Sequence, residues 1–289
     1  MPTVLEVLQK TAEFLSRREI PRGRLEAELL LARALACKRL DLYLRFDQPL
    51  AEAQLAPLRE QVARRGKREP LQYIAGRAGF LDFEVACDRR ALIPRPETEE
   101  LAELVFSRLA APPTAALDLG AGTGVLALAI ARHWSECKVT AIEASQDTLA
   151  LAQMNAATLG LTERMQFLNA RWPEFFNQVP DRYYLVVSNP PYLSEEEWAT
   201  AAPEVRDWEP KDALVAGENG LADLRAILQS APVCLAPGGL LALETGPTQH
   251  AALSDIATAA KQAGQAAYAR TESVCDLSGR DRFFLAWRC

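Results

Sequence analysis

The sequence is poor in the residues from which metal sites are usually built. Its 289 residues include only two histidines, and its six cysteines are scattered without a Cys-x-x-Cys pair. Structural zinc sites need closely spaced cysteines and histidines, so the sequence predicts no metal site and no histidine-based catalytic triad. We expect His133 and His250 to lie on the surfaces of helices, and the cysteines to be buried or incidental thiols.

Long apolar runs are missing as well. No run approaches the roughly 20 apolar residues that a membrane-spanning helix needs. Residues 1–6 lack the basic start, the apolar stretch and the cleavage site of a signal peptide. With 49% hydrophobic and 24% charged residues, the composition is that of a folded globular chain. We therefore expect a cytoplasmic protein without membrane contact, and nothing in the sequence indicates more than a monomer.

Positive charge is concentrated in the first third of the chain. Residues 1–96 contain 18 Lys and Arg against 13 Asp and Glu, whereas residues 97–289 contain 14 against 25. Much of the positive excess lies in the run RRGKR at residues 64–68. The run is interpreted either as a solvated helix end whose cations complement the helix dipole, or as a contact for an acidic protein or RNA.

The first segment has the pattern of a small helical domain. Thr3 and Glu6 have the spacing of a capping box at a helix start. Apolar residues then recur at helical spacing, with Val4, Leu8 and Leu15 in a first helix, Leu25, Leu29, Ala32 and Leu35 in a second, and Leu55, Leu58 and Val62 in a third. Pro57 should confine or bend the third helix. Residues 80–85 alternate like a hairpin strand, and residues 93–96 form a stiff link. We predict a helical domain at 1–78 and a hairpin with a linker at 79–96.

From residue 97 onward, helices alternate with short apolar strands. Strands are predicted at 115–119, 138–143, 165–168, 184–187, 239–244, 267–272 and 282–287, and helices at 97–110, 124–134, 147–159, 221–235 and 248–263. This alternation predicts a mostly parallel sheet with helices on both faces. No helix fits between the last two strands, so they should pair antiparallel. A seven-stranded α/β sheet with a reversed final hairpin is the Rossmann-like architecture of class I S-adenosylmethionine-dependent methyltransferases, which we predict for residues 97–289.

A glycine-rich loop joins the first strand of this sheet to a helix. Its glycines allow backbone amides to approach a ligand without an intervening side chain. Val125 stands where the dinucleotide fingerprint requires a third glycine, and the Gly-x-Gly-x-Gly spacing resembles the S-adenosylmethionine loop instead. The expected cofactor loop consists of Gly120, Ala121, Gly122, Thr123 and Gly124.

Side chains at the ends of the next two strands complete the predicted cofactor site. Glu143 closes the second strand, 23 residues after Gly120, where a carboxylate can accept both ribose hydroxyls of an adenosine. Asp118 is expected to orient the loop. Asn169 and Trp172 should lie beside the adenine, with the indole as a stacking face, although a core tryptophan is the alternative.

The tetrapeptide Asn189-Pro190-Pro191-Tyr192 follows the fourth strand and predicts a chemistry. If the side-chain oxygen of Asn189 and the carbonyl of Pro190 each accept an N–H, they turn a planar nitrogen toward a methyl donor and stabilise its developing charge. Proline fixes the backbone that carries the acceptor, and Tyr192 supplies an aromatic wall near the substrate. The alternative for the tetrapeptide alone is a rigid turn.

Taken together, these residues resemble the bacterial peptide chain release factor glutamine methyltransferases, which methylate the glutamine of a Gly-Gly-Gln motif. The resemblance covers nearly the whole chain and includes EPLQYIAG at 69–76, LIPRPETE at 92–99, WEP at 208–210, AL at 213–214, the glycines of 217–220, PGG at 237–239 and DLSGRDR at 276–282.

The resemblance implies roles for particular residues. S-adenosylmethionine would be bound by the loop Gly120, Ala121, Gly122, Thr123 and Gly124 together with Glu143, Trp172 and Asn189. The substrate glutamine would be held by Asn189, Pro190, Pro191 and Tyr192, of which Asn189, Pro190 and Tyr192 are the expected catalytic residues, while Arg95, Pro96 and Thr98 shape the site. The helical domain would dock a class 1 release factor, with no direct contact to nucleic acid.

Three positions depart from the family pattern. Arg171 stands where the family usually has an aspartate, Glu143 is longer than the usual aspartate, and Thr245 replaces an apolar residue, which we expect to cost little. Other functions stay open at this point: glutamine methylation of a ribosomal protein, methylation of an adenine amine in nucleic acid, or cofactor sensing without catalysis. The acidic composition of residues 97–289 disfavours a nucleic-acid substrate.

Overall fold

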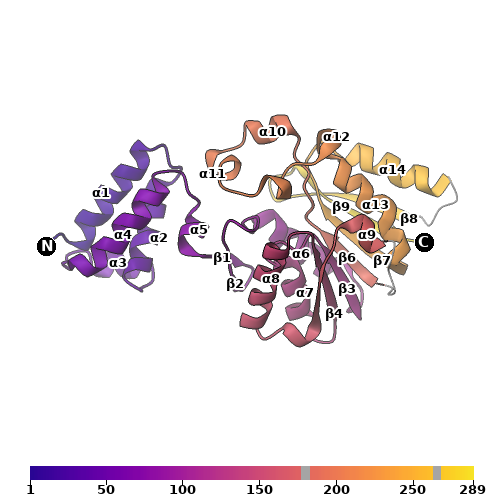
Figure 1. The fold of residues 1–289 in the computed structure, drawn as a ribbon, viewed down its shortest axis with the longest axis horizontal. Coiled ribbons are helices and arrows are strands. Elements are labelled where there is room, and N and C mark those ends of the chain that lie inside the picture. Colours follow the sequence, from indigo (N-terminus) through magenta and orange to yellow (C-terminus); the bar gives the residue numbers. More distant parts are fainter. Residues whose placement is uncertain (177–182, 263–267) are drawn as a thin grey trace. The chain divides into compact units, whose positions relative to one another are not determined.

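The chain folds into two compact units. The computed structural model describes residues 1–176, 183–262 and 268–289, and Figure 1 labels its helices and strands. A helical unit comprises Met1–Gly76 with Pro203–Trp208, and a sheet unit comprises Arg77–Ala202 with Glu209–Cys289. The limits predicted from the sequence differ in two respects, because they place residues 203–208 with the sheet and the hairpin outside it. The helical unit is therefore discontinuous in sequence.

The helical unit contains the three predicted helices and three shorter ones. Its elements are α1 (Val4–Arg17), α2 (Gly23–Ala34), α3 (Asp41–Leu44), α4 (Glu52–Arg65), α5 (Leu71–Ala75) and α11 (Pro203–Arg206). The predicted capping box is present, since the Thr3 hydroxyl accepts from the Glu6 amide and the Glu6 carboxylate accepts from the Thr3 amide. Pro57 lies inside α4 without ending it. The core of the unit includes Val4, Leu8, Leu15, Leu30, Leu31, Leu55 and Leu58, all buried.

The arginines of the basic run are paired within the helical unit. Arg65 is 3% exposed, and its guanidinium contacts Glu26 and lies 2.8 Å from Oε1 of Glu204. Arg68 reaches Oε2 of the same Glu204 at 2.8 Å, and Arg64 binds Glu69 at 2.6 Å. These three side chains therefore hold α11 and the loop after α4 in place, and they do not form the solvated helix end considered from the sequence.

A short hairpin begins the sheet unit. Strand β1 (Arg77–Phe80) pairs antiparallel with β2 (Phe83–Ala86), and Leu81 with Asp82 forms the turn between them. The alternating segment expected as one strand at 80–85 therefore contains the turn, and that expectation is wrong. Leu81 has a φ of 50°, a value that only turns commonly require of a leucine.

The large sheet has the predicted seven strands in the order β5-β4-β3-β6-β7-β9-β8. Their bounds are β3 (Ala115–Leu119), β4 (Lys138–Glu143), β5 (Met165–Asn169), β6 (Tyr183–Ser188), β7 (Leu235–Glu244), β8 (Tyr268–Cys275) and β9 (Asp281–Arg288). The first five pair in parallel, and β9 pairs antiparallel with both β7 and β8, as predicted. The predicted helix end at 263 and strand start at 267 lie outside the described residues.

Helices cover both faces of the sheet, which confirms the predicted α/β class (Figure 1). One face packs against α6 (Pro96–Arg108), α7 (Val125–His133) and α8 (Gln146–Thr158), and the other against α9 (Trp172–Phe176), α13 (Ala222–Cys234) and α14 (His250–Gln262). The remaining short helices are η1 (Thr162–Arg164), α10 (Glu195–Ala199), η2 (Lys211–Ala213) and α12 (Gly217–Gly220). Along β3, alternate residues face the two cores, with Ala116 toward one and Leu117 toward the other.

The strand order places the predicted site residues together. The order reverses between β3 and β6, and in an open parallel sheet ligands bind beyond the carboxyl ends of the strands at such a reversal. The glycine loop, Glu143, Asn189 and Glu244 follow or close β3, β4, β6 and β7, which are neighbours in the sheet. None of the helices within the described ranges is long and apolar enough to cross a membrane.

Candidate active site

The glycine loop after β3 is fixed by the neighbouring strand. The amides of Gly120 and Ala121 both donate to the carbonyl of Ile142 at 2.9 Å. Gly120, Gly122 and Gly124 all have positive φ, of 78°, 56° and 87°. A Cβ on Gly122 would have no atom within 4 Å, so this side of the loop faces open space that a ligand can enter.

The Glu143 carboxylate lies against this loop. Its Oε2 accepts from the amide of Gly122 at 3.1 Å, and its Oε1 accepts from the amide of Ser145 at 3.0 Å. An ionised carboxylate offers about four lone-pair sites, so two directions stay available for ribose hydroxyls after these two bonds. The structure thus places Glu143 where the sequence predicted it, oriented by the loop itself.

Trp172 and Asn169 lie next to the same strand ends. A Cβ on Gly120 would be 3.4 Å from the indole of Trp172, which places that ring against the loop. The side-chain amide of Asn169 donates to the carbonyls of Glu143 and Ala144 at 2.8 and 2.9 Å. Asn169 therefore supports the backbone around Glu143 through its nitrogen.

Asp118 and Asn155 hold the loop from behind. Asp118 is 1% exposed, its Oδ2 accepts from the amide of Ala127 at 3.1 Å, and burial raises its pKa to about 7. Asn155 on α8 donates to the carbonyl of Thr123 at 2.9 Å, and it exchanges hydrogen bonds with the backbone of Ala86 in β2. No motif in the sequence marks Asn155, and its role depends on contacts with the distant residues Ala86 and Thr123.

The tetrapeptide after β6 is tied to α6 and β7. The side-chain nitrogen of Asn189 donates to the hydroxyl of Thr98 at 3.0 Å. The Thr98 hydroxyl donates to Oε2 of Glu244 at 2.7 Å, and the hydroxyl of Tyr192 donates to Oε1 of Glu244 at 3.0 Å. Pro96 opens α6 at its first position and so sets Thr98 in the first turn of that helix. Thr98 therefore directly contacts the tetrapeptide Asn189-Pro190-Pro191-Tyr192, which we call the clamp.

Burial perturbs the acids of this cluster. Glu244 is 1% exposed, and burial raises its pKa above the ordinary value, against the opposing hydrogen bonds from Thr98 and Tyr192. Burial, with the neighbouring Glu244 charge, also raises the pKa of Tyr192. Tyr192 therefore stays protonated and acts as a donor to Glu244.

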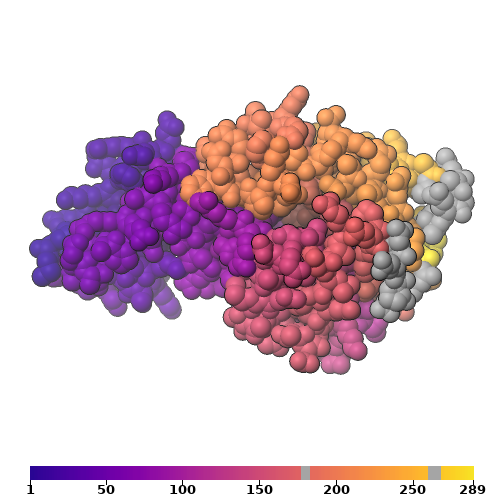
Figure 2. Space-filling view, viewed as in Figure 1, coloured from indigo at the N-terminus to yellow at the C-terminus, as the bar shows by residue number. Residues whose placement is uncertain are grey.

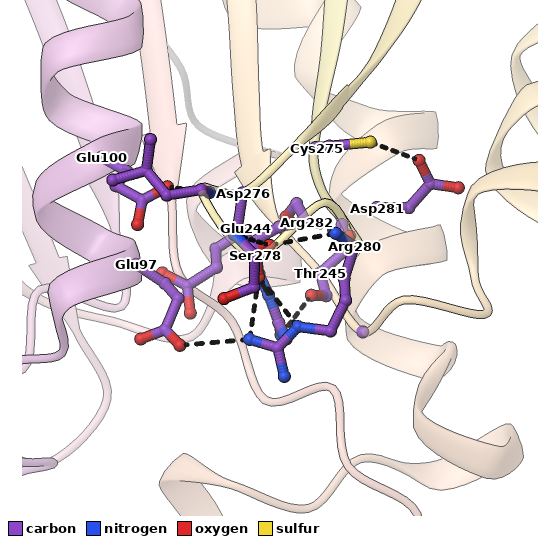
Figure 3. Close-up of polar contacts among 12 residues, drawn as sticks. Glu97, Glu100, Glu244, Thr245, Cys275, Asp276, Ser278, Arg280, Asp281 and Arg282 are labelled. Atoms are coloured by element: carbon purple, nitrogen blue, oxygen red, sulfur yellow. Dashed lines mark hydrogen bonds and ion pairs between the residues drawn. The ribbon is translucent and has the colours of Figure 1, made fainter.

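Strand β9 supplies a cation near Glu244, Arg282, and Figure 3 labels both residues. Nη1 of Arg282 lies 3.4 Å from the Tyr192 hydroxyl and donates to the carbonyl of Thr245 at 2.9 Å. Asp276 accepts from the amides of Ser278 and Arg280 and thereby shapes the turn. The segment DLSGRDR, read from the sequence only as a family pattern, thus orders an arginine against the clamp.

Arg95 is paired with a carboxylate. Its Nη2 lies 2.5 Å from Oε1 of Glu209, whose Oε2 accepts from the amide of Ile93 at 3.2 Å. Burial raises the pKa of Glu209, opposed by Arg95. Glu209 therefore binds both the side chain of Arg95 and the backbone of Ile93, and it fixes the segment that leads to Thr98.

His250 corrects an expectation. It is buried at 5% exposure rather than lying on a helix surface, and its Nε2 is 2.7 Å from the hydroxyl of Thr245. Burial lowers the pKa of His250. Thr245, the unusual residue of the Glu-Thr-Gly segment, thus has a buried polar partner, which gives a physical reason for a hydroxyl at that position.

Gln249 and Gly220 fix the backbone of Tyr192. Nε2 of Gln249 donates to the carbonyls of Tyr192 and Gly220 at 2.8 and 3.2 Å, and its Oε1 accepts from the amide of Gly246 at 2.8 Å. Gly220 has a φ of 86°, and a Cβ there would lie 2.1 Å from the Tyr192 carbonyl oxygen. The last residue of the clamp is therefore held by α12 and the start of α14.

Comparison with known proteins gives both family and fold. Residues 6–76 match the model of the PrmC N-terminal domain, and residues 97–205 match that of the methyltransferase small domain. The release factor glutamine methyltransferase of Chlorobaculum tepidum is 40% identical over 250 residues, which cover 84% of this chain and 85% of that protein. That of Nitratidesulfovibrio vulgaris is 35% identical over 286 residues, covering 99% and 95%. A methyltransferase from Pyrococcus furiosus has the same fold, with a TM-score of 0.50 at 20% identity, covering 71% of this chain and 87% of that one.

Proposed function

The chain belongs to the family of release factor glutamine methyltransferases, and from this premise we propose that it methylates the glutamine of the Gly-Gly-Gln motif in class 1 release factors. It is a methyltransferase that uses S-adenosylmethionine. The observation that carries the proposal is the orientation of Asn189. Its nitrogen is bound to Thr98, which leaves its oxygen as an acceptor for a substrate N–H.

The cofactor fits the residues after β3 and β4. The open side of Gly122 leaves room for a ligand against the backbone. The two remaining acceptor directions on Glu143 suit the hydroxyls of a ribose, and the indole of Trp172 suits an adenine. When bound, S-adenosylmethionine supplies a methyl group on a sulfonium sulfur, which keeps the electron pair of the broken S–C bond. The cofactor residues are thus the loop, Glu143, Trp172 and Asn189.

The clamp supplies orientation rather than a base. The Asn189 oxygen and the Pro190 carbonyl each accept one N–H of the glutamine amide, so the lone pair of the nitrogen is directed toward the methyl carbon. The nitrogen forms the new N–C bond and then gives one proton to solvent. Methylation makes the amide nitrogen acidic, so its proton leaves without a base. Catalysis therefore depends mainly on the two acceptors, which stabilise the positive charge that develops on the nitrogen. Tyr192 and Pro191 pack against the substrate side chain.

The test of this function uses the purified chain, S-adenosylmethionine and a full-length unmodified class 1 release factor. Mass spectrometry should show the mass of one added methyl group on the peptide that contains Gly-Gly-Gln. An unchanged peptide at high enzyme concentration would contradict the proposal. Transfer of label to RNA or to a ribosomal protein would instead support one of the alternative substrates.

The helical unit carries most of the exposed large hydrophobic side chains. Seven of the eleven found among the described residues lie within the first 46 positions, namely Met1, Leu5, Leu29, Leu40, Tyr43, Leu44 and Phe46. This part of the surface is indigo in Figure 2. The amide of Leu5 donates to the carbonyl of Phe46 at 3.0 Å, so the start of α1 lies beside the residues that follow α3. Exposed apolar residues that gather on a surface mark interaction sites, and we propose that the exposed side chains of residues 1–46, among which Leu5 lies beside Phe46, dock the release factor.

Replacing Leu44 and Phe46 together with serine should therefore weaken use of the whole release factor. These side chains are 82% and 54% exposed, so the fold should not depend on them. We expect the KM for full-length release factor to rise roughly tenfold, which corresponds to about 1.4 kcal/mol, and kcat/KM for a short Gly-Gly-Gln peptide to stay constant. Met154→Ser, at a 45% exposed position on α8, is the matched control. Equal losses on peptide and protein would contradict a docking role.

Glu143→Gln should weaken cofactor binding while keeping the length and shape of the side chain. Hydrogen bonds to a charged acceptor contribute about 1.5 to 3 kcal/mol, so we expect a loss of affinity on the order of tenfold to a hundredfold. Calorimetric titration with S-adenosylhomocysteine measures this directly. Wild-type affinity in the variant would show that Glu143 serves only the amides of Gly122 and Ser145.

A further inference from the structure

The hydrogen bonds around Glu244 all run toward its carboxylate. Glu244 closes β7 and accepts from the hydroxyls of Thr98 and Tyr192 at 2.7 and 3.0 Å. Beyond Thr98 lies the side-chain nitrogen of Asn189 at 3.0 Å, and beyond Tyr192 lies Nη1 of Arg282 at 3.4 Å. Residues from α6, β7, β9 and the clamp therefore share one chain of donors and acceptors around the buried Glu244.

Counting the protons in this chain fixes the direction of the Asn189 amide. An ionised carboxylate has no proton, so both hydroxyls must donate to it. A hydroxyl has only one proton, and the oxygen of Thr98 can therefore meet Asn189 only with a lone pair. The Asn189 group that faces Thr98 is then the NH₂ end, and the oxygen end points away as an acceptor. The charge on Glu244 thus reaches Asn189 through a single hydroxyl, that of Thr98.

We propose that Glu244 is a positioning residue that sets which end of the Asn189 amide faces the substrate nitrogen, a role that rests on the proposed function. With a neutral group at position 244 that donates to Thr98, the Thr98 proton turns toward Asn189. The Asn189 amide then presents its oxygen to Thr98 and its NH₂ to the substrate. An NH₂ facing the N–H of glutamine cannot accept it, so the clamp loses one of its two acceptors.

Arg282 makes glutamine at position 244 adopt this inverted arrangement. The guanidinium is always protonated and faces the Tyr192 oxygen as a donor, so the Tyr192 proton has to go to residue 244. The carbonyl end of a glutamine would then face Tyr192, and its NH₂ end would face Thr98. Glutamate and glutamine have the same shape, and they differ here mainly in the direction that they impose on Asn189.

The charged surroundings of Glu244 predict a pH dependence. Tyr192 and Arg282 face it from the clamp and β9, and Glu97 adds a like charge from α6. Burial raises the pKa of Glu244, so it gains its proton at a higher pH than an exposed glutamate. Protonated Glu244 can donate to Thr98 and invert the clamp, and kcat should therefore fall as the pH falls through this pKa.

The experiment compares Glu244→Gln with the unaltered chain on full-length unmodified release factor. We expect kcat at neutral pH to fall roughly tenfold and the acid limb of its pH profile to disappear. Affinity for S-adenosylhomocysteine should fall less than kcat, because Glu143 and the loop are unchanged and only the orientation of the Asn189 amide differs. Thermal unfolding of the variant checks that it is folded at the assay temperature. Unchanged kcat together with an unchanged acid limb would overturn the proposal.

Thr98 provides a matched pair of variants that tests the same path. Thr98→Ser keeps the hydroxyl and should keep kcat within about threefold, whereas Thr98→Val keeps the shape and should lose roughly tenfold. Adding Glu244→Gln to Thr98→Val should not lower kcat further, because the valine already removes the hydroxyl that links Glu244 to Asn189. Equal losses in the serine and valine variants, or additive losses in the double variant, would contradict a path through the hydroxyl. If the unaltered chain fails to methylate the release factor, the proposed function fails and not the role of Glu244.

Discussion

Asn189→Ala is expected to lower kcat for release factor methylation by roughly 30- to 1,000-fold, on the order of 2 to 4 kcal/mol of transition-state stabilisation. The asparagine oxygen is one of two acceptors that turn the glutamine nitrogen toward the methyl carbon. Its removal leaves the proline carbonyl alone, and the amide can then rotate out of line.

Cofactor affinity separates this effect from a collapse of the site. The loop and Glu143 are fixed by their own backbone bonds, so binding of S-adenosylhomocysteine should weaken less than kcat falls. Gln153→Ala, which removes an exposed amide from α8, serves as the control and should change neither quantity. Methylation by Asn189→Ala at the wild-type rate would refute the assigned role of Asn189.

The elements could be predicted because local pattern and final environment agree. Residues 115–119 are apolar except for Asp118 and are followed by the glycine-rich segment 120–124, and β3 is buried on both faces and ends in the cofactor loop. The carboxyl ends of parallel neighbours meet at one edge, so the ordering of loop, Glu143 and Asn189 in the sequence already places them together. Thus the groups predicted for cofactor and clamp lie at one edge of the sheet.

The polar partners of these groups could not be predicted, because they come from distant parts of the chain. Thr98 and Glu244 are 146 positions apart, and their contact depends on α6 packing against β7. The arginines of the basic run likewise meet Glu204, which lies 139 positions after Arg65. The partner of a charged residue cannot be identified from its neighbours in the sequence. From the sequence, the basic run is therefore interpreted as exposed, although folding places Glu204 beside it.

His250 illustrates a second limit. Its position at the start of a helix says nothing about which way the first turn faces, and a lone histidine in a polar segment reads as exposed. In the structure α14 begins at His250, and the ring packs edge-on against Phe284 with Nε2 at the Thr245 hydroxyl. The rotation of a helix about its axis is set by the surface that it covers, and this information is tertiary.

Gly220→Ala is expected to damage both stability and catalysis, because a methyl group there meets the backbone of the clamp. A Cβ would lie 2.1 Å from the Tyr192 carbonyl oxygen and 2.8 Å from Nε2 of Gln249. The carbonyl has to move by about 1 Å, and a displacement of that size in a catalytic group costs roughly 10²-fold in rate. Overpacking adds about 1 to 3 kcal/mol of destabilisation to the strain of alanine at positive φ.

Gly160→Ala separates the collision from the strain. Gly160 follows α8 with a φ of 68°, and a Cβ there would have no atom within 4 Å. Both alanine variants should therefore lose about 1 to 2 kcal/mol from the left-handed backbone, but only Gly220→Ala should lose more and lose kcat. Thermal unfolding and single-turnover methylation of the two variants measure both terms. Equal unfolding temperatures and a wild-type kcat in Gly220→Ala would mean that α12 yields to the methyl group, and that the position of the Tyr192 carbonyl does not depend on the space left by Gly220.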